Sequence, residues 1–197
     1  AACPATGRRG LSACGSSALA TPGTTGATKA AVQKADAALV AKLPAKIKAA
    51  GKIVVGVDTS YPPNEFLAAD GKTATGMDID LFKQVAQKFG VTVEWKTAAF
   101  GTIILGVSSG KFDIGVSSFT INPDREKQAT MVSYYTAGTL WVVPKGNPKH
   151  VDPDNACRLN VRDQTDTAQT DGLAPRHPTC AAPSQQQPHP AATAPTH

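Results

Sequence analysis

Residues 112–125, Phe-Asp-Ile-Gly-Val-Ser-Ser-Phe-Thr-Ile-Asn-Pro-Asp-Arg, carry the signals of a buried strand followed by a helix. The apolar run at 112–116 is typical of a buried strand. Asn122 is a favourable residue just before a helix, and Pro123 fits its first position because the N–H that proline lacks would have no partner there. Arg125 would then lie on the first turn. The stretch predicts a strand, a polar connection and a helix beginning near residue 123.

Small hydroxyl groups occupy the predicted connection, at Ser117, Ser118 and Thr120. A helix N-terminus offers unpaired N–H groups and partial positive charge, and the Arg125 guanidinium can bind a carboxylate through two hydrogen bonds. These groups together would bind a small molecule that has one carboxylate. An ordinary capped helix with a solvated arginine would give the same pattern, so the stretch alone leaves both interpretations open.

The hydrophobic pattern elsewhere predicts alternating strands and helices. We expect strands at 53–58, 91–95, 112–117 and 139–143, and helices at 28–40, 44–51, 80–89, 102–109 and 122–129. This order is typical of an α/β fold with a largely parallel sheet. Ligands bind at the carboxyl ends of such strands, so the residues after the first and the third strand should meet at one edge.

Several short motifs follow one another along the chain. They are Val55-Gly56-Val57-Asp58, Tyr61-Pro62-Pro63, Gly76-Met77-Asp78-Ile79-Asp80-Leu81, Gly110-Lys111-Phe112-Asp113 and Ser117 to Gln128. In this order they resemble the family 3 bacterial extracellular solute-binding proteins, over about residues 43–154. The resemblance implies a periplasmic-binding-protein-like lobe, a polar or charged amino acid as the ligand, and the membrane permease of an ABC importer as the partner.

The resemblance also implies which residues contact the amino acid. They are Asp58, Tyr61, Ser117, Ser118, Phe119, Thr120 and Arg125. Arg125 would bind the α-carboxylate, and Ser118 and Thr120 would bind the α-ammonium. One of the two aromatic residues would pack on the ligand's body, and the aspartate would face its side chain. Asp58 could equally be a turn former and Tyr61 a packing aromatic.

The resembled family has two lobes, and we expect the second to be incomplete here. The family would continue after Cys157 with a strand and a Gly-Thr helix start, whereas residues 162–167 read Arg-Asp-Gln-Thr-Asp-Thr. We therefore expect a signal remnant, lipoprotein tether and N-terminal helix at 1–42, the first lobe at 43–145, a remnant of the second at 146–163, and a low-complexity, disordered tail at 164–197. Such a chain would bind amino acids weakly.

Cysteines suggest an extracytoplasmic location. Residues 11–17, Leu-Ser-Ala-Cys-Gly-Ser-Ser, resemble a lipoprotein processing site at which Cys14 is lipidated, although no apolar region precedes it. Some members of the resembled family carry a disulfide near Cys157, which implies a bridge to Cys180; two free thiols remain the alternative. The cysteines lack metal-site spacing, so we expect no metal and no cofactor.

Composition and motifs weigh against two other classes of protein. The net charge of +5 comes mostly from dispersed lysines without interleaved aromatics, so we expect no nucleic-acid partner. The same fold supports cyclic-acid dehydratases, but all four histidines lie at or after residue 150, and Glu65 is the only residue expected near the cleft that could serve as a catalytic acid. We predict a binding protein; a dehydratase-like enzyme and a non-functional fragment remain the alternatives.

Overall fold

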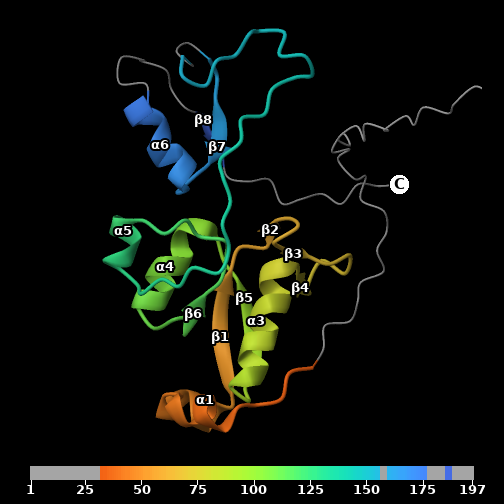
Figure 1. The fold of residues 1–197 in the computed structure, drawn as a ribbon, viewed down its shortest axis with the longest axis vertical. Helices are drawn as coiled ribbons and strands as arrows, with labels where there is room; N and C mark the ends of the chain where they lie inside the picture. Colours follow the sequence, from red (N-terminus) through yellow and green to blue (C-terminus); the bar gives the residue numbers. More distant parts are fainter. Residues whose placement is uncertain (1–31, 156–158, 177–184, 188–197) are drawn as a thin grey trace, which may run out of the picture. The chain divides into compact units, whose positions relative to one another are not determined.

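The computed structural model describes residues 32–155, 159–176 and 185–187 (Figure 1). Its elements, in chain order, are α1 (Ala37–Lys42), α2 (Ala45–Ala50), β1 (Lys52–Val57), β2 (Ser60–Tyr61), β3 (Glu65–Leu67), β4 (Ala74–Thr75), α3 (Met77–Lys88), β5 (Thr92–Thr97), α4 (Phe100–Ser108), β6 (Ile114–Gly115), α5 (Pro123–Glu126), β7 (Arg162–Gln164), α6 (Ala168–Arg176) and β8 (Gln185–Gln187). The described residues all fall within one unit, Val32–His197.

A parallel sheet forms the centre of the fold, with β1 between β5 and β6. β1 pairs with β5 along its whole length, from Lys52 opposite Thr92 to Val57 opposite Thr97. Its pairing with β6 is short, at Val55 opposite Ile114 and at the next residue pair. The apolar, largely β-branched sequence of β1 suits a strand buried on both faces. The predicted α/β class and parallel sheet are confirmed.

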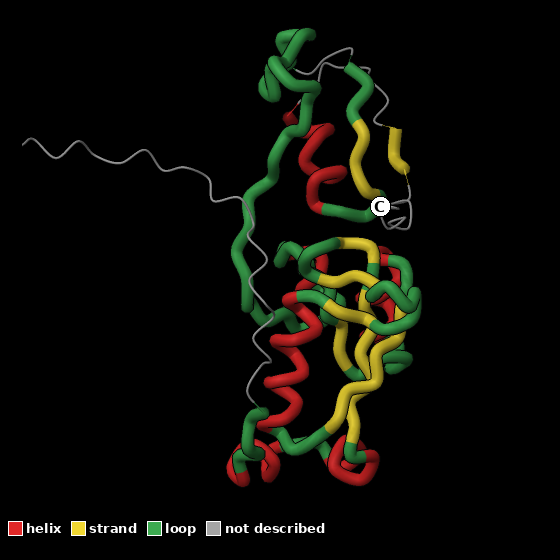
Figure 2. The backbone as a smooth tube through the Cα atoms, turned by 90° about the vertical axis from the view of Figure 1, so that its right-hand side faces the viewer, coloured by secondary structure: helices red, strands yellow, loops and turns green. Residues whose placement is uncertain are grey.

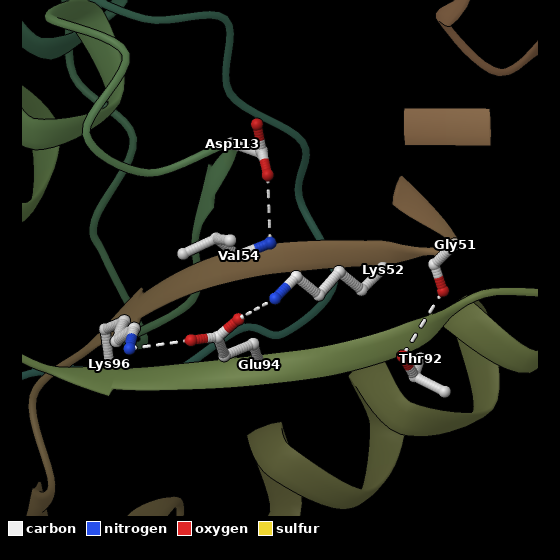
Figure 3. Close-up of polar contacts among 7 residues, drawn as sticks. All are labelled: Gly51, Lys52, Val54, Thr92, Glu94, Lys96 and Asp113. Carbon is white, nitrogen blue, oxygen red and sulfur yellow. Dashed lines mark hydrogen bonds and ion pairs between the residues drawn. The ribbon is translucent and has the colours of Figure 1, made fainter. Parts of the chain in front are cut away.

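Polar side chains tie β1 to its neighbours at the surface (Figure 3). The Glu94 carboxylate on β5 makes ion pairs of 2.6 Å with Lys52 and with Lys96. These hydrogen bonds and charges lower the pKa of Glu94 to about 2. On the other side of β1, an Asp113 carboxylate oxygen accepts the Val54 N–H at 2.9 Å and so extends the pairing beyond β6.

Helix α3 packs along the sheet (Figure 2), and its start is set by a glycine. Gly76 precedes it with a φ of 123°, and a Cβ there would lie 2.2 Å from the Asn64 carbonyl oxygen. The principal apolar cluster joins the sheet to helices α2 and α3. Its buried members are Ile47, Ile53, Val55, Ala86, Val91 and Val116.

A second, antiparallel sheet follows β1 and contributes residues to one side of the site. Strand β3 lies between β2 and β4, with Tyr61 opposite Glu65 and Phe66 opposite Thr75. The Asn64 carbonyl oxygen accepts the Asp78 N–H at 3.0 Å. This sheet therefore connects the end of β1 to the start of α3, and it brings polar residues of both elements beneath the same edge.

Four predicted elements differ from the observed ones, and the strand expected at 112–117 is only the two residues of β6, Ile114–Gly115. The first helix begins at Ala37 with Asp36 as its cap, not at residue 28, and residues 28–31 lie outside the described part. The helix expected at 122–129 is the single turn α5. The strand expected at 139–143 is wrong: these residues are irregular, and Leu140 and Val142 are 88% and 93% exposed. A strand needs a partner for its backbone groups, and none pairs with this segment among the described residues.

The expectation for residues 162–167 is also wrong. They form β7 and a turn that leads into α6. Residues 162–167 were expected to lack both the family's strand and its helix start. Asp166 has a φ of 65° in the turn, a conformation that glycine adopts more readily. Residues 164–176 are therefore not a structureless tail. The expected segment boundaries themselves stay a prediction.

Candidate functional site

Arg125 lies in α5 with its side chain turned into the protein. The Asn122 side-chain oxygen accepts the Arg125 N–H at 2.9 Å, which confirms the predicted cap. Arg125 is only 8% exposed, and its guanidinium donates to the carbonyl oxygens of Thr120 and Asp166, each at 2.8 Å. Burial lowers its pKa, and the negative charges of Asp171 and Asp166 oppose that shift. The solvated alternative for Arg125 is thereby excluded.

Two stacked aromatic rings lie beside this guanidinium. Phe100 and Phe119 have their ring centroids 4.4 Å apart and their planes at 26°. The central guanidinium carbon of Arg125 is 5.4 Å from each centroid, within the range of cation–π attraction. Phe100 was not foreseen. It lies three residues after the end of β5, so applying the strand-end rule to that strand as well would have found it.

Asp58 holds the turn after β1. One carboxylate oxygen accepts the Ser60 N–H at 3.1 Å and the Ser60 hydroxyl at 2.6 Å. The other accepts the Phe100 N–H at 3.1 Å and lies 3.4 Å from the Gln164 side-chain nitrogen. Asp58 therefore fixes the start of α4 as well as its own turn, which agrees with the turn-former alternative. It also leaves a negative charge at this edge.

Ser117 connects the end of β6 to the end of β1. Its hydroxyl accepts the Asp58 N–H and donates to a carboxyl oxygen of Glu65, both at 3.0 Å. The side chain is 2% exposed. These contacts confirm that the two strand ends meet at one edge, but they also occupy the hydroxyl that was expected to reach the ligand.

Ser118 has a strained backbone and several partners. Its φ is 46°, in the left-handed region that costs a residue with a side chain roughly 1–2 kcal/mol. Its N–H points at a carboxylate oxygen of Asp78 and at the Tyr134 hydroxyl, each 3.0 Å away. Its own hydroxyl accepts from the Asn64 amide at 2.8 Å.

Two acids lie buried beneath Ser117 and Ser118. Glu65 is 1% exposed and Asp78 fully buried. Burial first, and then the hydrogen bond to the neighbouring Asp78 and its negative charge, raise the pKa of Glu65 to about 9. Burial and the same aspartate also raise the pKa of Tyr134. The roles of Asn64, Asp78 and Tyr134 were missed, although the first two lie in or beside quoted motifs.

The remaining predicted residues lie at the surface of the site. Tyr61 is 47% exposed in β2, and Thr120 is exposed with its carbonyl held by Arg125. Cys14, Cys157 and Cys180 lie outside the described residues. Among the described residues, His, Cys, Asp and Glu form no group of three able to hold a metal ion, and no helix is long and apolar enough to cross a membrane.

Comparison with known proteins places this geometry in a family. The family model described as bacterial extracellular solute-binding proteins, family 3, matches residues 53–176. The chain belongs to this family. The match extends past the stretch quoted for the resemblance and includes β7 and α6, the part in which the family pattern was expected to end.

Relatives named for amino-acid binding resemble the chain over part of their length. The arginine-binding protein ArgT of Corynebacterium glutamicum is 32% identical over 143 residues, which are 72% of this chain and 47% of the relative. The L-cystine-binding protein TcyJ of Escherichia coli K12 is 31% identical over 103 residues, 52% of this chain and 38% of the relative. The chain spans about half the length, or less, of these relatives.

Solved structures of amino-acid-binding proteins also resemble the chain. An ancestral arginine-binding protein bound to arginine has a TM-score of 0.61 and 32% identity, covering 65% of this chain and 57% of that one. An ancestral amino acid-binding protein, described as a precursor of cyclohexadienyl dehydratase, has a TM-score of 0.63 and 32% identity, covering 68% and 61%. The periplasmic-binding-protein-like fold class is confirmed. One of these two solved structures is described as the precursor of an enzyme.

Proposed function

We propose that the chain is the amino-acid-binding component of an ABC importer and acts outside the cytoplasm. The carrying observation is the buried Arg125 guanidinium, whose hydrogen-bond partners are two neutral carbonyl oxygens. Among the described residues it makes no ion pair with a carboxylate within 4 Å. A buried cation is best compensated by an anion in hydrogen-bond contact, so the α-carboxylate of an amino acid is its complementary ligand.

The other predicted contacts follow the same edge. Thr120 offers an exposed hydroxyl beside the guanidinium, and Tyr61 and Phe119 offer rings for the ligand's body. Asp58 faces the ligand's side chain and helps to set specificity. Relatives are named for arginine and for L-cystine, so these two amino acids are the first ligands to try.

Titration calorimetry with a panel of amino acids tests the proposal. Arg125→Ala should weaken binding by about thirtyfold or more, because truncating one partner of a buried charge pair costs roughly 2–5 kcal/mol. Lys127→Ala is the matched control, since it removes an exposed cation of the same segment whose ion-pair partner among the described residues is Asp124. Unchanged affinity in the Arg125 variant, with Lys127→Ala also unchanged, would contradict the assignment.

Two further parts of the proposal concern partners and chemistry. The chain would deliver its ligand to a membrane permease and be held at the membrane by a lipid on Cys14. Mass spectrometry of the membrane fraction should find this lipid. An unmodified Cys14 would contradict the lipid anchor. Incubation with prephenate-like cyclic acids should yield no product. Product formation would move the chain to the enzyme alternative.

A further inference from the structure

A pair of carboxyl groups lies beneath the predicted ligand-binding edge. Glu65 comes from β3 and Asp78 from the first turn of α3, and both are shielded from solvent. Within residues 32–155, which the structure describes without a gap, neither acid makes an ion pair with Lys, Arg or His. Two adjacent buried carboxylates cannot both stay charged, so one proton must be shared between them.

The hydrogen-bond donors gather on one oxygen of one of the two acids. One oxygen of Asp78 accepts from the Ser118 N–H at 3.0 Å, the Ser118 hydroxyl at 2.9 Å and the Tyr134 hydroxyl at 2.6 Å. Three donors on one oxygen favour a carboxylate. The other oxygen of Asp78 is buried and has no donor among the groups described. The Ser118 hydroxyl lies 2.9 Å from Asp78 and 3.3 Å from Glu65, so the two carboxyl groups are neighbours and a protonated Glu65 would supply the missing donor.

The same bonds hold Ser118 in its left-handed conformation. Such a conformation persists only where the surroundings over-determine it. Here Asp78 takes the Ser118 N–H, the Asn64 amide donates to its hydroxyl, and a carboxyl oxygen of Glu65 lies 3.3 Å from that hydroxyl. Glu65 also accepts from Ser117, so the pair controls both serines of the turn.

We propose that Glu65 and Asp78 are positioning residues that share one proton and hold the Ser117–Ser118 turn in the shape that binds the amino acid, without touching the ligand themselves. This inference rests on the proposed function. The shared proton lies between Glu65 and the free oxygen of Asp78, and the negative charge stays on the oxygen that holds Ser118 and Tyr134.

Loss of the proton would disturb the turn. The titratable group facing Asp78, besides Glu65, is Tyr134, and Glu65 otherwise faces the hydroxyls of Ser117 and Ser118. Asp58 lies beyond Ser117, bound to it through its N–H. Deprotonation of Glu65 puts a second negative charge against Asp78 with no cation of residues 32–155 to compensate it. Ligand affinity should therefore fall at alkaline pH.

Glu65→Gln removes the titrating proton of Glu65 while it keeps the size of the side chain. The glutamine amide can donate to Asp78 and its carbonyl oxygen can accept from Ser117, but the side chain does not titrate. At about pH 7 we expect an affinity within roughly threefold of the unchanged chain. Between about pH 7 and pH 10 the dissociation constant of the unchanged chain should rise about tenfold more than that of the variant. The ligand's own ammonium titrates equally in the two experiments. The quantity to compare is therefore the ratio of the two dissociation constants at each pH.

Two other variants complete the test. Asp78→Asn replaces the triple acceptor and should weaken binding by about tenfold or more. Glu94→Gln, which changes a carboxylate paired with surface lysines, is the control and should behave like the unchanged chain. Parallel pH profiles of the unchanged chain and Glu65→Gln, or full affinity in Asp78→Asn, would overturn the proposal.

A measurement without ligand separates this proposal from the proposed function. The infrared carbonyl band of a protonated carboxylic acid should be present in the unchanged chain at neutral pH and absent in Glu65→Gln. If no amino acid binds, the proposed function fails while a band that disappears in the variant still supports the shared proton. The absence of the band from the unchanged chain would contradict the shared proton of Glu65 and Asp78, whatever the binding result.

Discussion

At the scale of single residues, Asp113 shows how a side chain can extend a sheet. Strand β6 is short, yet the Asp113 carboxylate accepts the Val54 N–H of β1 at 2.9 Å and pairs with Lys46 at 2.9 Å through its other oxygen. These two contacts, the backbone hydrogen bond first, lower the pKa of Asp113. The aspartate therefore compensates a backbone donor that the strand itself does not reach.

Asp113→Ala should lower the free energy of unfolding by about 1–3 kcal/mol at neutral pH, because it leaves the partly buried Val54 N–H without its acceptor. An acid whose pKa is depressed in the folded state stabilises above its ordinary pKa and loses that contribution as pH falls through the folded value. The free energies of unfolding of the unchanged chain and of Asp113→Ala, measured with urea, should therefore become equal in acid. Asp124→Ala, which removes an exposed carboxylate, is the control, and an equal loss in both variants would contradict the assignment.

At the scale of elements, one aromatic ring sets how closely α4 approaches the sheet. Phe112 is buried between Gly56 of β1 and Gly106 of α4. A Cβ at either glycine would lie 2.5 Å from the ring. The helix and strand can enclose the ring because both positions lack a side chain.

Gly106→Ala should destabilise the protein by about 1–3 kcal/mol, since overpacking a filled core displaces the ring. The gain in helix propensity, about 1 kcal/mol at most, should not offset this. Gly138→Ala is the control because, among the described residues, no atom would lie within 4 Å of a Cβ at this position. Chemical denaturation measures both, and a Gly106→Ala protein as stable as the original would refute the close packing.

At the scale of the whole molecule, the sheet region and the segment after α5 differ in how their backbone is held. The parallel sheet is paired on both sides of β1, whereas residues 130–143 form neither helix nor strand. Tyr134 is bonded to Asp78, but Leu140 and Val142 are exposed. Local opening is least costly where backbone hydrogen bonds and buried apolar contacts are few.

Limited digestion with chymotrypsin should therefore cut first between residues 135 and 143. Trp95 and Phe112 lie in or beside the sheet and should stay intact over the same period. Mass spectrometry of the early fragments identifies the cuts. A first cleavage within residues 52–115 would show that the sheet region opens more easily than its hydrogen bonding indicates.

Local signals in the sequence predicted several of the elements and one part of the site. The apolar run of β1, the Asn122-Pro123 cap and the helix-stopping Gly51 act on neighbouring residues, so they could be found without the fold. The order of strands and helices then predicted a parallel sheet and the meeting of two strand ends. The strand expected at 139–143 failed because a strand depends on a partner, which its own residues do not specify.

Only the tertiary structure decided what the polar side chains do. Ser117 and Asp58 looked available for a ligand, yet they bond to each other across 59 positions. The buried acids depend on equally distant partners: Ser118 lies 40 positions from Asp78, and Tyr134 lies 56 from it. Hydrogen bonds and burial between such residues set charge and orientation, and both exist only once the chain has folded. Motifs and periodicity therefore determined the family and the guanidinium at Arg125, while folding determined which acid holds the proton and which serines are already occupied.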